Sequence, residues 1–133
     1  MSRKKAREGL VFLMYQSLFD DHINADKIDL FIENFDYNKV QSTYINNGYN
    51  NITQHIEEID SVISKNLKNW SIERMYKLDL SILRVAVYEI LFEEETPNEV
   101  AVNEAVEIAK TYGTTDSSKL INGILGTILR SRK

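Results

Sequence analysis

The chain has 133 residues, with 16 Lys and Arg against 20 Asp and Glu, and this length suits one domain with a buried core. It contains no cysteine, which excludes disulfides, thiolate zinc sites and cysteine nucleophiles. No apolar run reaches the ~18–20 residues of a membrane span and no signal peptide begins the chain, so we expect a soluble, cytoplasmic protein that binds no membrane.

Positive charge is concentrated at the two ends of the chain, although the net charge is −4. Seven of the 16 basic residues lie in residues 3–7 and 130–133, where there is no acid. The other nine share residues 8–129 with all 20 acids. This segregation favours an anionic partner for the ends, and the alternative is a solvated, frayed tail. The seven basic residues are Arg3, Lys4, Lys5, Arg7, Arg130, Arg132 and Lys133.

The first half of the chain has apolar residues at helical spacing. Residues 6–18 predict a first helix that carries the basic cluster on its opening turns. Cations at that end of a helix oppose the macrodipole, so their placement favours binding over local stability. Residues 28–35 predict a short second helix. The run from Val40 to Leu67 predicts one long amphipathic helix, in which Gly48 marks a close approach of another helix.

The second half predicts three more helical segments. Residues 80–92 are apolar nearly all round, which indicates the buried central helix of a bundle. The next helix starts at TPNE, with Thr96 as N-cap, Pro97 at the first position and Glu99 completing a capping box, and Gly113 can end it. Residues 120–128 define a final helix. We therefore predict one all-α domain over residues 1–133, a bundle of about six to seven helices.

The segment GTTDSSKL combines hydroxyl groups, a lysine and the free N–H groups of a helix start, which together favour anion binding. The alternative is that its Ser, Thr or Asp side chains only cap the helix, with Asp116 or Ser117 as N-cap. The charge of Asp116 would repel a phosphate, so it either lowers the affinity or serves as the cap.

Motifs for catalysis, metal binding or phosphate-loop binding are absent from the sequence. His22 and His55 have no metal-ligand spacing, and Gly123 and Gly126 lie inside a helix instead of a strand-to-helix loop. We therefore expect no enzyme, no metal and no cofactor. Tyr15 and Phe19 widen the apolar stripe of the first helix, so they either join the core or form an exposed aromatic rim for a protein partner.

Three blocks of sequence carry a family resemblance. They read RKKAREGLVFLMYQ, LDLSILRVAVYEILF and VAVNEAVEIAKTYGTTDSSKLINGIL. In these blocks the chain resembles the NusB family of bacterial transcription antitermination factors. The resemblance covers the first helix and nearly all of residues 70–128, whereas residues 20–69 are generic in pattern.

The resemblance implies two packed helical subdomains and a function without catalysis. NusB proteins bind the boxA element of nascent RNA together with the ribosomal protein NusE, and the complex joins RNA polymerase and other Nus factors during elongation. There it supports transcription of ribosomal RNA operons. Monomeric and homodimeric members both occur, and the sequence does not choose between these states.

The resemblance also implies two RNA-binding patches and one NusE-binding surface. The RNA-contacting start of the first helix matches Arg3, Lys4, Lys5 and Arg7. The second RNA patch matches Thr115, Asp116, Ser117, Lys119 and Leu120. The NusE-binding surface matches Tyr15, Phe19 and Asp79. Leu120 departs from the family's common Phe and cannot stack a ring on a base.

Two other interpretations stay open from the sequence. One is a helical protein-interaction module that binds no specific RNA, with basic ends that touch only protein. The other is an RNA-binding accessory domain of an RNA-modifying enzyme, which is disfavoured because no catalytic domain follows residue 133.

Overall fold

A computed structural model of the chain describes residues 2–20, 23–68 and 71–132. These residues form seven α-helices and a short 3-10 helix, as the all-α prediction expected. The α-helices are α1 (Ser2–Ser17), α2 (Ala25–Asn34), α3 (Lys39–Gln54), α4 (Ile56–Lys65), α5 (Lys77–Phe92), α6 (Asn98–Tyr112) and α7 (Ser117–Ser131), with the 3-10 helix η1 at Ile72–Arg74.

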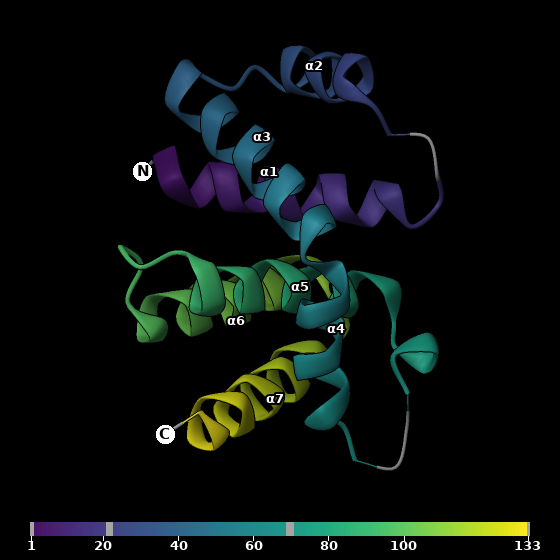
Figure 1. The fold of residues 1–133 in the computed structure, drawn as a ribbon, viewed down its shortest axis with the longest axis vertical. Coiled ribbons are helices and arrows are strands. Elements are labelled where there is room, and N and C mark those ends of the chain that lie inside the picture. Colours follow the sequence, from purple (N-terminus) through teal and green to yellow (C-terminus); the bar gives the residue numbers. More distant parts are fainter. Residues whose placement is uncertain (1, 21–22, 69–70, 133) are drawn as a thin grey trace.

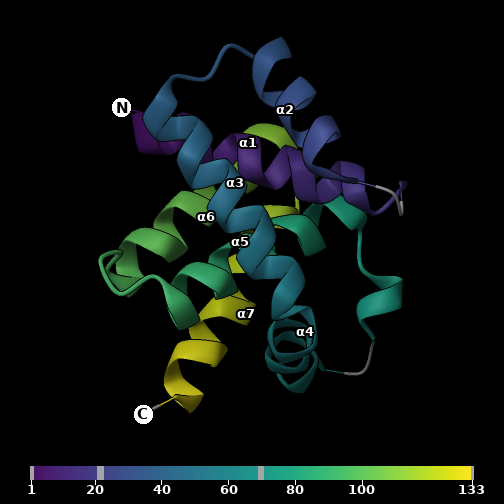
Figure 2. The same ribbon diagram turned by 45° about the horizontal axis from the view of Figure 1, so that its top comes forward.

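The helices form two packed groups (Figure 1). α1 and α3 cross each other in the upper group, with α2 along its outer edge. The lower group holds α5, α6 and α7, with α4 beside them. Both ends of the chain lie on the same side of the molecule in Figure 1 and in the turned view of Figure 2.

α5 is the central helix, as its apolar composition predicted. It contacts α1, α3, α4, α6 and α7, so it is shared by both groups. Twelve of its residues are buried, including the polar Asp79, Ser81 and Glu89. A helix surrounded on all sides in this way is stabilised mainly by the apolar area it removes from water.

The long helix predicted from Val40 to Leu67 is divided in the structure. α3 ends and α4 begins at His55, whose backbone has φ −114° and ψ 24°. Before the break, the Thr53 hydroxyl donates to the carbonyls of Tyr49 and Asn50, and such side-chain bonds compete with the helix backbone. At the break, the ring of His55 packs on Phe92 of α5, with 4.5 Å between the ring centroids.

The predicted capping box at TPNE is absent. α6 begins at Asn98, and Pro97 is the N-cap residue with extended backbone and no side-chain capping bond. Thr96 is buried before the helix instead of capping it. Gly113 ends α6 as predicted, and its N–H donates to the carbonyl of Ala109.

Candidate nucleic-acid interface

The first three cations of the predicted cluster are exposed on the opening turns of α1. The guanidinium of Arg3 lies over the ring of Tyr44, 4.9 Å from its centroid. The ammonium of Lys5 lies 5.2 Å from the ring centroid of Tyr37 and donates to the carbonyl of Asp36 at 3.1 Å. Aromatic faces attract cations, so α3 and the loop before it hold these two charges in place while leaving them open to solvent.

Arg7 differs from its neighbours in the cluster, and its predicted exposure to a phosphate is wrong for this structure. Its side chain is 6% exposed, and Nε donates to both oxygens of Glu89 at 2.9 Å. The hydroxyl of Tyr44 donates to the same carboxylate at 2.9 Å. Burial raises the pKa of Glu89, and the charge and hydrogen bonds of Arg7 act against that rise. Burial beside this carboxylate also raises the pKa of Tyr44.

The start of α7 presents part of the predicted second patch. Thr115, Asp116 and Lys119 are exposed and Leu120 is half-buried. Asp116 is the N-cap residue, but its side chain makes no capping hydrogen bond. The hydroxyl of Ser117 instead accepts from the backbone N–H of Thr114 at 2.9 Å. The carboxylate of Asp116 therefore stays on the surface beside the helix start.

Ser117 and Asp79, which the resemblance assigns to the second RNA patch and to the NusE-binding surface, are both buried. Ser117 is 1% exposed and Asp79 is 4% exposed, on the third position of α5. Burial raises the pKa of Asp79, whereas a hydrogen bond from the Ser117 hydroxyl lowers it. The Oδ1 atom of Asp79 has no hydrogen-bond partner within the described part of the chain. This pair joins the start of α5 to the start of α7 and is not open to a ligand.

Tyr15 and Phe19 form an exposed aromatic pair at the end of α1. Tyr15 is 37% exposed and Phe19 is 63% exposed, and their rings meet edge to face at 5.2 Å. One turn earlier, Phe12 contacts Tyr112 at the end of α6, 5.0 Å between centroids. The aromatic pair therefore lies at the same end of the bundle as the start of α7.

The two predicted RNA patches lie at opposite ends of α5. The ion pair of Arg7 and Glu89 places the start of α1 beside the last turns of α5. The Asp79–Ser117 bond places the start of α7 beside the first turn. α5 has 16 residues, so it is about 24 Å long at 1.5 Å per residue. The structure therefore brings the second patch close to the aromatic pair and leaves the basic cluster apart from both.

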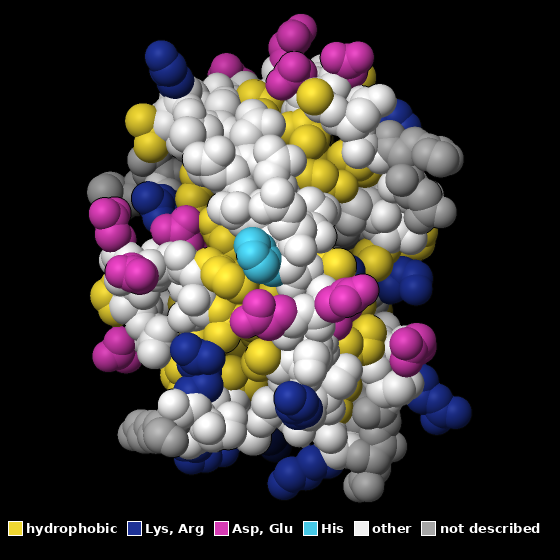
Figure 3. Space-filling model, viewed as in Figure 1, with side chains coloured by type: hydrophobic (Ala, Val, Ile, Leu, Met, Phe, Trp, Pro, Cys, Tyr) yellow, Lys and Arg dark blue, Asp and Glu magenta, His cyan; other side chains and the backbone are white. Residues whose placement is uncertain are grey.

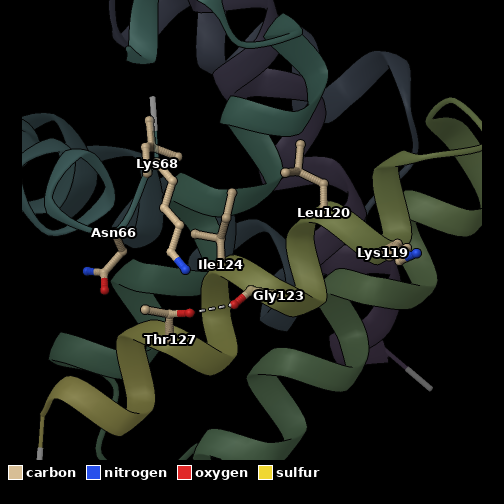
Figure 4. A pocket seen from close by; sticks show the side chains of 8 residues that line it. Asn66, Lys68, Lys119, Leu120, Gly123, Ile124 and Thr127 are labelled. Atoms are coloured by element: carbon tan, nitrogen blue, oxygen red, sulfur yellow. Dashed lines mark hydrogen bonds between the residues drawn. The ribbon is translucent and has the colours of Figure 1, made fainter. Parts of the chain in front are cut away.

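A cavity lies beside each patch. The one at the start of α1 has a volume of about 390 Å³ and is lined by Arg3, Lys39, Val40, Thr43, Tyr44, Asn47 and Glu93. The one beside Lys119 has a volume of about 330 Å³ and is lined by Asn66, Leu67, Lys68, Lys119, Leu120, Gly123, Ile124 and Thr127 (Figure 4). Sequence reasoning missed Lys39, Tyr44, Asn66 and Lys68, because these residues reach the patches only through the packing of separate helices.

Charge is unevenly distributed on the face in Figure 3. Asp and Glu side chains gather over α2, which carries Asp26, Asp29 and Glu33, all exposed. Lys and Arg side chains are more frequent in the lower part, over the end of α4 and α7. The body is therefore not uniformly acidic, and the cavity beside Lys119 lies in its more basic region.

Among residues 2–20, 23–68 and 71–132, no cluster of three or more His, Asp or Glu side chains is arranged to hold a metal ion. No helix in the described chain is long and apolar enough to cross a membrane.

Comparison with known proteins finds a family model and relatives that belong to the same family. The family model described as the NusB family matches residues 4–130. The transcription antitermination protein NusB of Clostridium novyi is 41% identical, over 98% of this chain and 100% of that protein. The protein of the same name from Finegoldia magna is 40% identical, over 100% of this chain and 97% of that protein.

Solved structures agree with the sequence relatives. A NusB structure from T. maritima superposes with a TM-score of 0.88 at 34% identity and covers 98% of this chain and 92% of its own. A crystal structure of antitermination factors NusB and NusE in complex with double-stranded RNA superposes with a TM-score of 0.89 at 27% identity, covering 98% of this chain and 97% of its own.

Proposed function

This chain belongs to the NusB family, and we propose that it is a transcription antitermination factor that binds boxA RNA together with ribosomal protein NusE. The family match over residues 4–130, joined to the exposed cations at the start of α1, carries this proposal. The relatives are named for transcription antitermination and not for a catalysed reaction, so the chain is a binding protein and not an enzyme. The NusB and NusE complex with RNA supports both partners.

The finer steps of the proposal extend this binding to transcription. The bound chain joins RNA polymerase and other Nus factors during elongation in the cytoplasm and supports transcription of ribosomal RNA operons. Residues 1–133 act as one domain in this complex.

In this proposal, each group of exposed residues has a separate role in RNA binding. Arg3, Lys4 and Lys5 neutralise phosphates of the RNA, while the Arg7–Glu89 pair holds α1 on α5 so that these cations face outward. Thr115 and Lys119 form the second RNA patch, and Asp116 lowers its affinity by repelling phosphate. Sequence selectivity comes from contacts to unpaired bases, as is usual for single-stranded RNA.

Tyr15 and Phe19 form the NusE-binding surface in this proposal. A pair of exposed aromatic rings supplies a large apolar contact area, and such residues are enriched at the centres of protein interfaces. Asp79 is only 4% exposed, so this proposal assigns it no contact with the partner. Phe19→Ala, which truncates the more exposed ring, weakens NusE binding by calorimetry and leaves weak RNA binding by the free protein unchanged. Unchanged NusE affinity removes this ring from the interface.

The proposal is tested by fluorescence anisotropy of a labelled boxA RNA at several salt concentrations, with and without NusE, against a scrambled RNA of equal length. The triple variant of Arg3, Lys4 and Lys5 to Ala loses affinity, and its slope of log affinity against log salt is flatter by about 2, since each lost phosphate contact contributes ~0.7 for single strands. Arg7 is left unchanged, because its substitution would lower the stability of the fold. A change in RNA affinity could then not be assigned to a lost phosphate contact.

The matched control replaces three other exposed or half-exposed cations, Lys27, Arg74 and Lys110, with Ala, which changes the net charge equally. Its RNA affinity stays close to that of the wild type. Equal binding of the wild type to boxA and scrambled RNA, unaffected by NusE, would instead favour a helical interaction module without specific RNA binding.

A further inference from the structure

The cavity of about 330 Å³ beside Lys119 lies between the segment that follows α4 and the face of α7 from Lys119 to Thr127 (Figure 4). Its volume falls in the ~300–1,000 Å³ range of pockets that hold small organic groups. Only Lys119 and Leu120 of its lining belong to the predicted second patch. The rest of the lining, including Asn66, Lys68 and Gly123, extends away from that patch.

Gly123 has no packing reason to be glycine. A Cβ atom built on it meets no heavy atom within 4 Å, so the position faces open space. Glycine inside a helix destabilises it relative to alanine, because glycine loses more backbone freedom on folding. The missing side chain leaves the backbone of α7 exposed at the floor of the cavity. Glycine at such a position allows a ligand to approach the backbone closely.

The lining has three chemical parts. Leu67, Leu120 and Ile124 supply apolar walls, Asn66 and Thr127 are neutral and polar, and two lysines are cationic. Among the described residues, no acidic side chain lines the cavity. In Figure 4 the ammonium of Lys68 extends toward Ile124 and Thr127, whereas Lys119 projects from the opposite edge with its ammonium directed away. Apolar walls around the bare backbone at Gly123, with a lysine on either side, fit a flat, uncharged ring whose neighbours on both sides carry negative charge.

We propose that this cavity holds one unstacked nucleobase of single-stranded RNA, with the base against Gly123 and its flanking phosphates at Lys68 and Lys119. The inference rests on the proposed RNA-binding function and names the site within it that takes a base. Leu120 cannot stack a ring, and in this arrangement it serves as an apolar wall while the floor at Gly123 receives the face of the base. An apolar side chain of a protein partner would gain nothing from the two lysines.

The test compares two alanine substitutions in one helix. Gly123→Ala fills the floor of the cavity, whereas Gly126→Ala is the matched control outside it, where an added Cβ meets only the flexible end of Arg130 at 3.3 Å. Both raise the melting temperature, by about 3–5 °C, because alanine favours the helix. Gly123→Ala weakens binding of a boxA-bearing single-stranded RNA about tenfold, the effect of losing one stacked base. Gly126→Ala leaves that affinity unchanged.

Abasic RNA identifies the base. Each nucleotide of the RNA is replaced in turn by an abasic one, and one replacement weakens wild-type binding about tenfold. The same replacement does not weaken binding to Gly123→Ala further, because the base is already excluded there. Such non-additivity assigns that base to the cavity.

Four outcomes overturn the inference. If the wild type selects boxA RNA and Gly123→Ala retains full affinity, the cavity takes no base while the proposed function stands. If Gly126→Ala weakens RNA binding equally, or Gly123→Ala weakens NusE binding instead, the cavity is again not a base site. If the wild type binds boxA and scrambled RNA equally, the proposed function itself fails.

Discussion

The guanidinium of Arg7 and the carboxylate of Glu89 form an ion pair that is almost closed to solvent, with side-chain exposures of 7% and 1%. Removing two charges from water costs several kcal/mol for each ion, and their attraction offsets this only when further hydrogen bonds satisfy both groups. The Tyr44 hydroxyl supplies such a bond from α3. The net stabilisation by the pair is therefore smaller than the free energy lost when one partner is removed. Removing one partner leaves the other as an unpaired buried charge.

Replacing Arg7 with Leu is expected to lower the free energy of unfolding by about 3–5 kcal/mol near pH 8. The folded-state pKa of Glu89 lies above its ordinary value of 4.5, so the stability this group contributes is present below pH 4.5 and is lost as the pH rises through the folded pKa. Loss of Arg7 raises that pKa further. Urea unfolding followed by circular dichroism should therefore show a smaller deficit at pH 5 than at pH 8.

The double variant Arg7→Leu with Glu89→Leu is the control for this argument. It removes both charges, so it should recover much of the deficit at pH 8 and lose the pH dependence. Equal deficits in the single and double variants at both pH values would contradict the ion-pair explanation.

The Ser117 hydroxyl accepts from the Thr114 N–H and lowers the raised pKa of the buried Asp79 carboxyl by hydrogen bonding. Ser117→Ala is expected to lower the free energy of unfolding by about 1–3 kcal/mol at pH 7, because it removes the acceptor of the Thr114 N–H and a donor to a buried carboxyl. The pKa of Asp79 is already raised by burial and would rise further, so the deficit should shrink as the pH falls and the carboxyl takes up a proton. Thermal unfolding at pH 5 and pH 7 measures both effects. A deficit that grows toward low pH would show that Ser117 acts elsewhere.

At the scale of helices, the crossing of α1 and α3 depends on Gly48. A Cβ atom there would come within 2.5 Å of Cδ2 of Leu10, whose side chain is fully buried. The close approach that the sequence predicted for Gly48 is thus confirmed, and its partner is α1.

Gly48→Ala is expected to destabilise the protein by about 1–3 kcal/mol through overpacking, although alanine is the better helix former. The sign is opposite to that expected for Gly123→Ala, where the added methyl group meets open space. Thermal unfolding of both variants under one condition tests the contrast. Leu10→Ala combined with Gly48→Ala should be less destabilised than the two single effects added together, since the methyl group then has room.

The sequence predicted the helices better than their boundaries. α5 was clear because a helix that is apolar on all sides has only one favourable environment, the centre of a bundle. The break at His55 was missed because the apolar period continues across it, from Ile52 to Ile56 and Ile59. At the break, the ring of His55 contacts Phe92, a residue far away in the chain, and no local pattern indicates this contact.

The exposure of the predicted site residues depends on tertiary packing that the local pattern does not show. Arg3, Lys4 and Lys5 are exposed on the opening turns of α1. Arg7 belongs to the same charge cluster, but its partner Glu89 lies 82 residues away, and nothing near Arg7 in the sequence indicates burial. The same holds for Ser117, whose acceptor Asp79 lies on another helix.

For the molecule as a whole, α5 links the groups that the proposed function uses. The basic cluster lies beside one end of this helix, which is about 24 Å long, and the second patch with the aromatic pair lies beside the other end. An RNA that contacts both patches must therefore run along the molecule instead of entering a single pocket. The positions of both patches depend on the same buried helix, so a change in its packing would move them together.

This shared helix predicts that the chain unfolds as one cooperative unit, as a single domain over residues 1–133 would. α1 and α3 on one side and α6 and α7 on the other all contact α5, so neither group can open without exposing its apolar surface. Calorimetry should give a single transition whose measured enthalpy equals the van't Hoff enthalpy. Gly48→Ala, in the upper group, and Ser117→Ala, in the lower group, should each shift that whole transition to lower temperature. Two transitions, of which each variant moves only one, would show that the two helical groups fold independently.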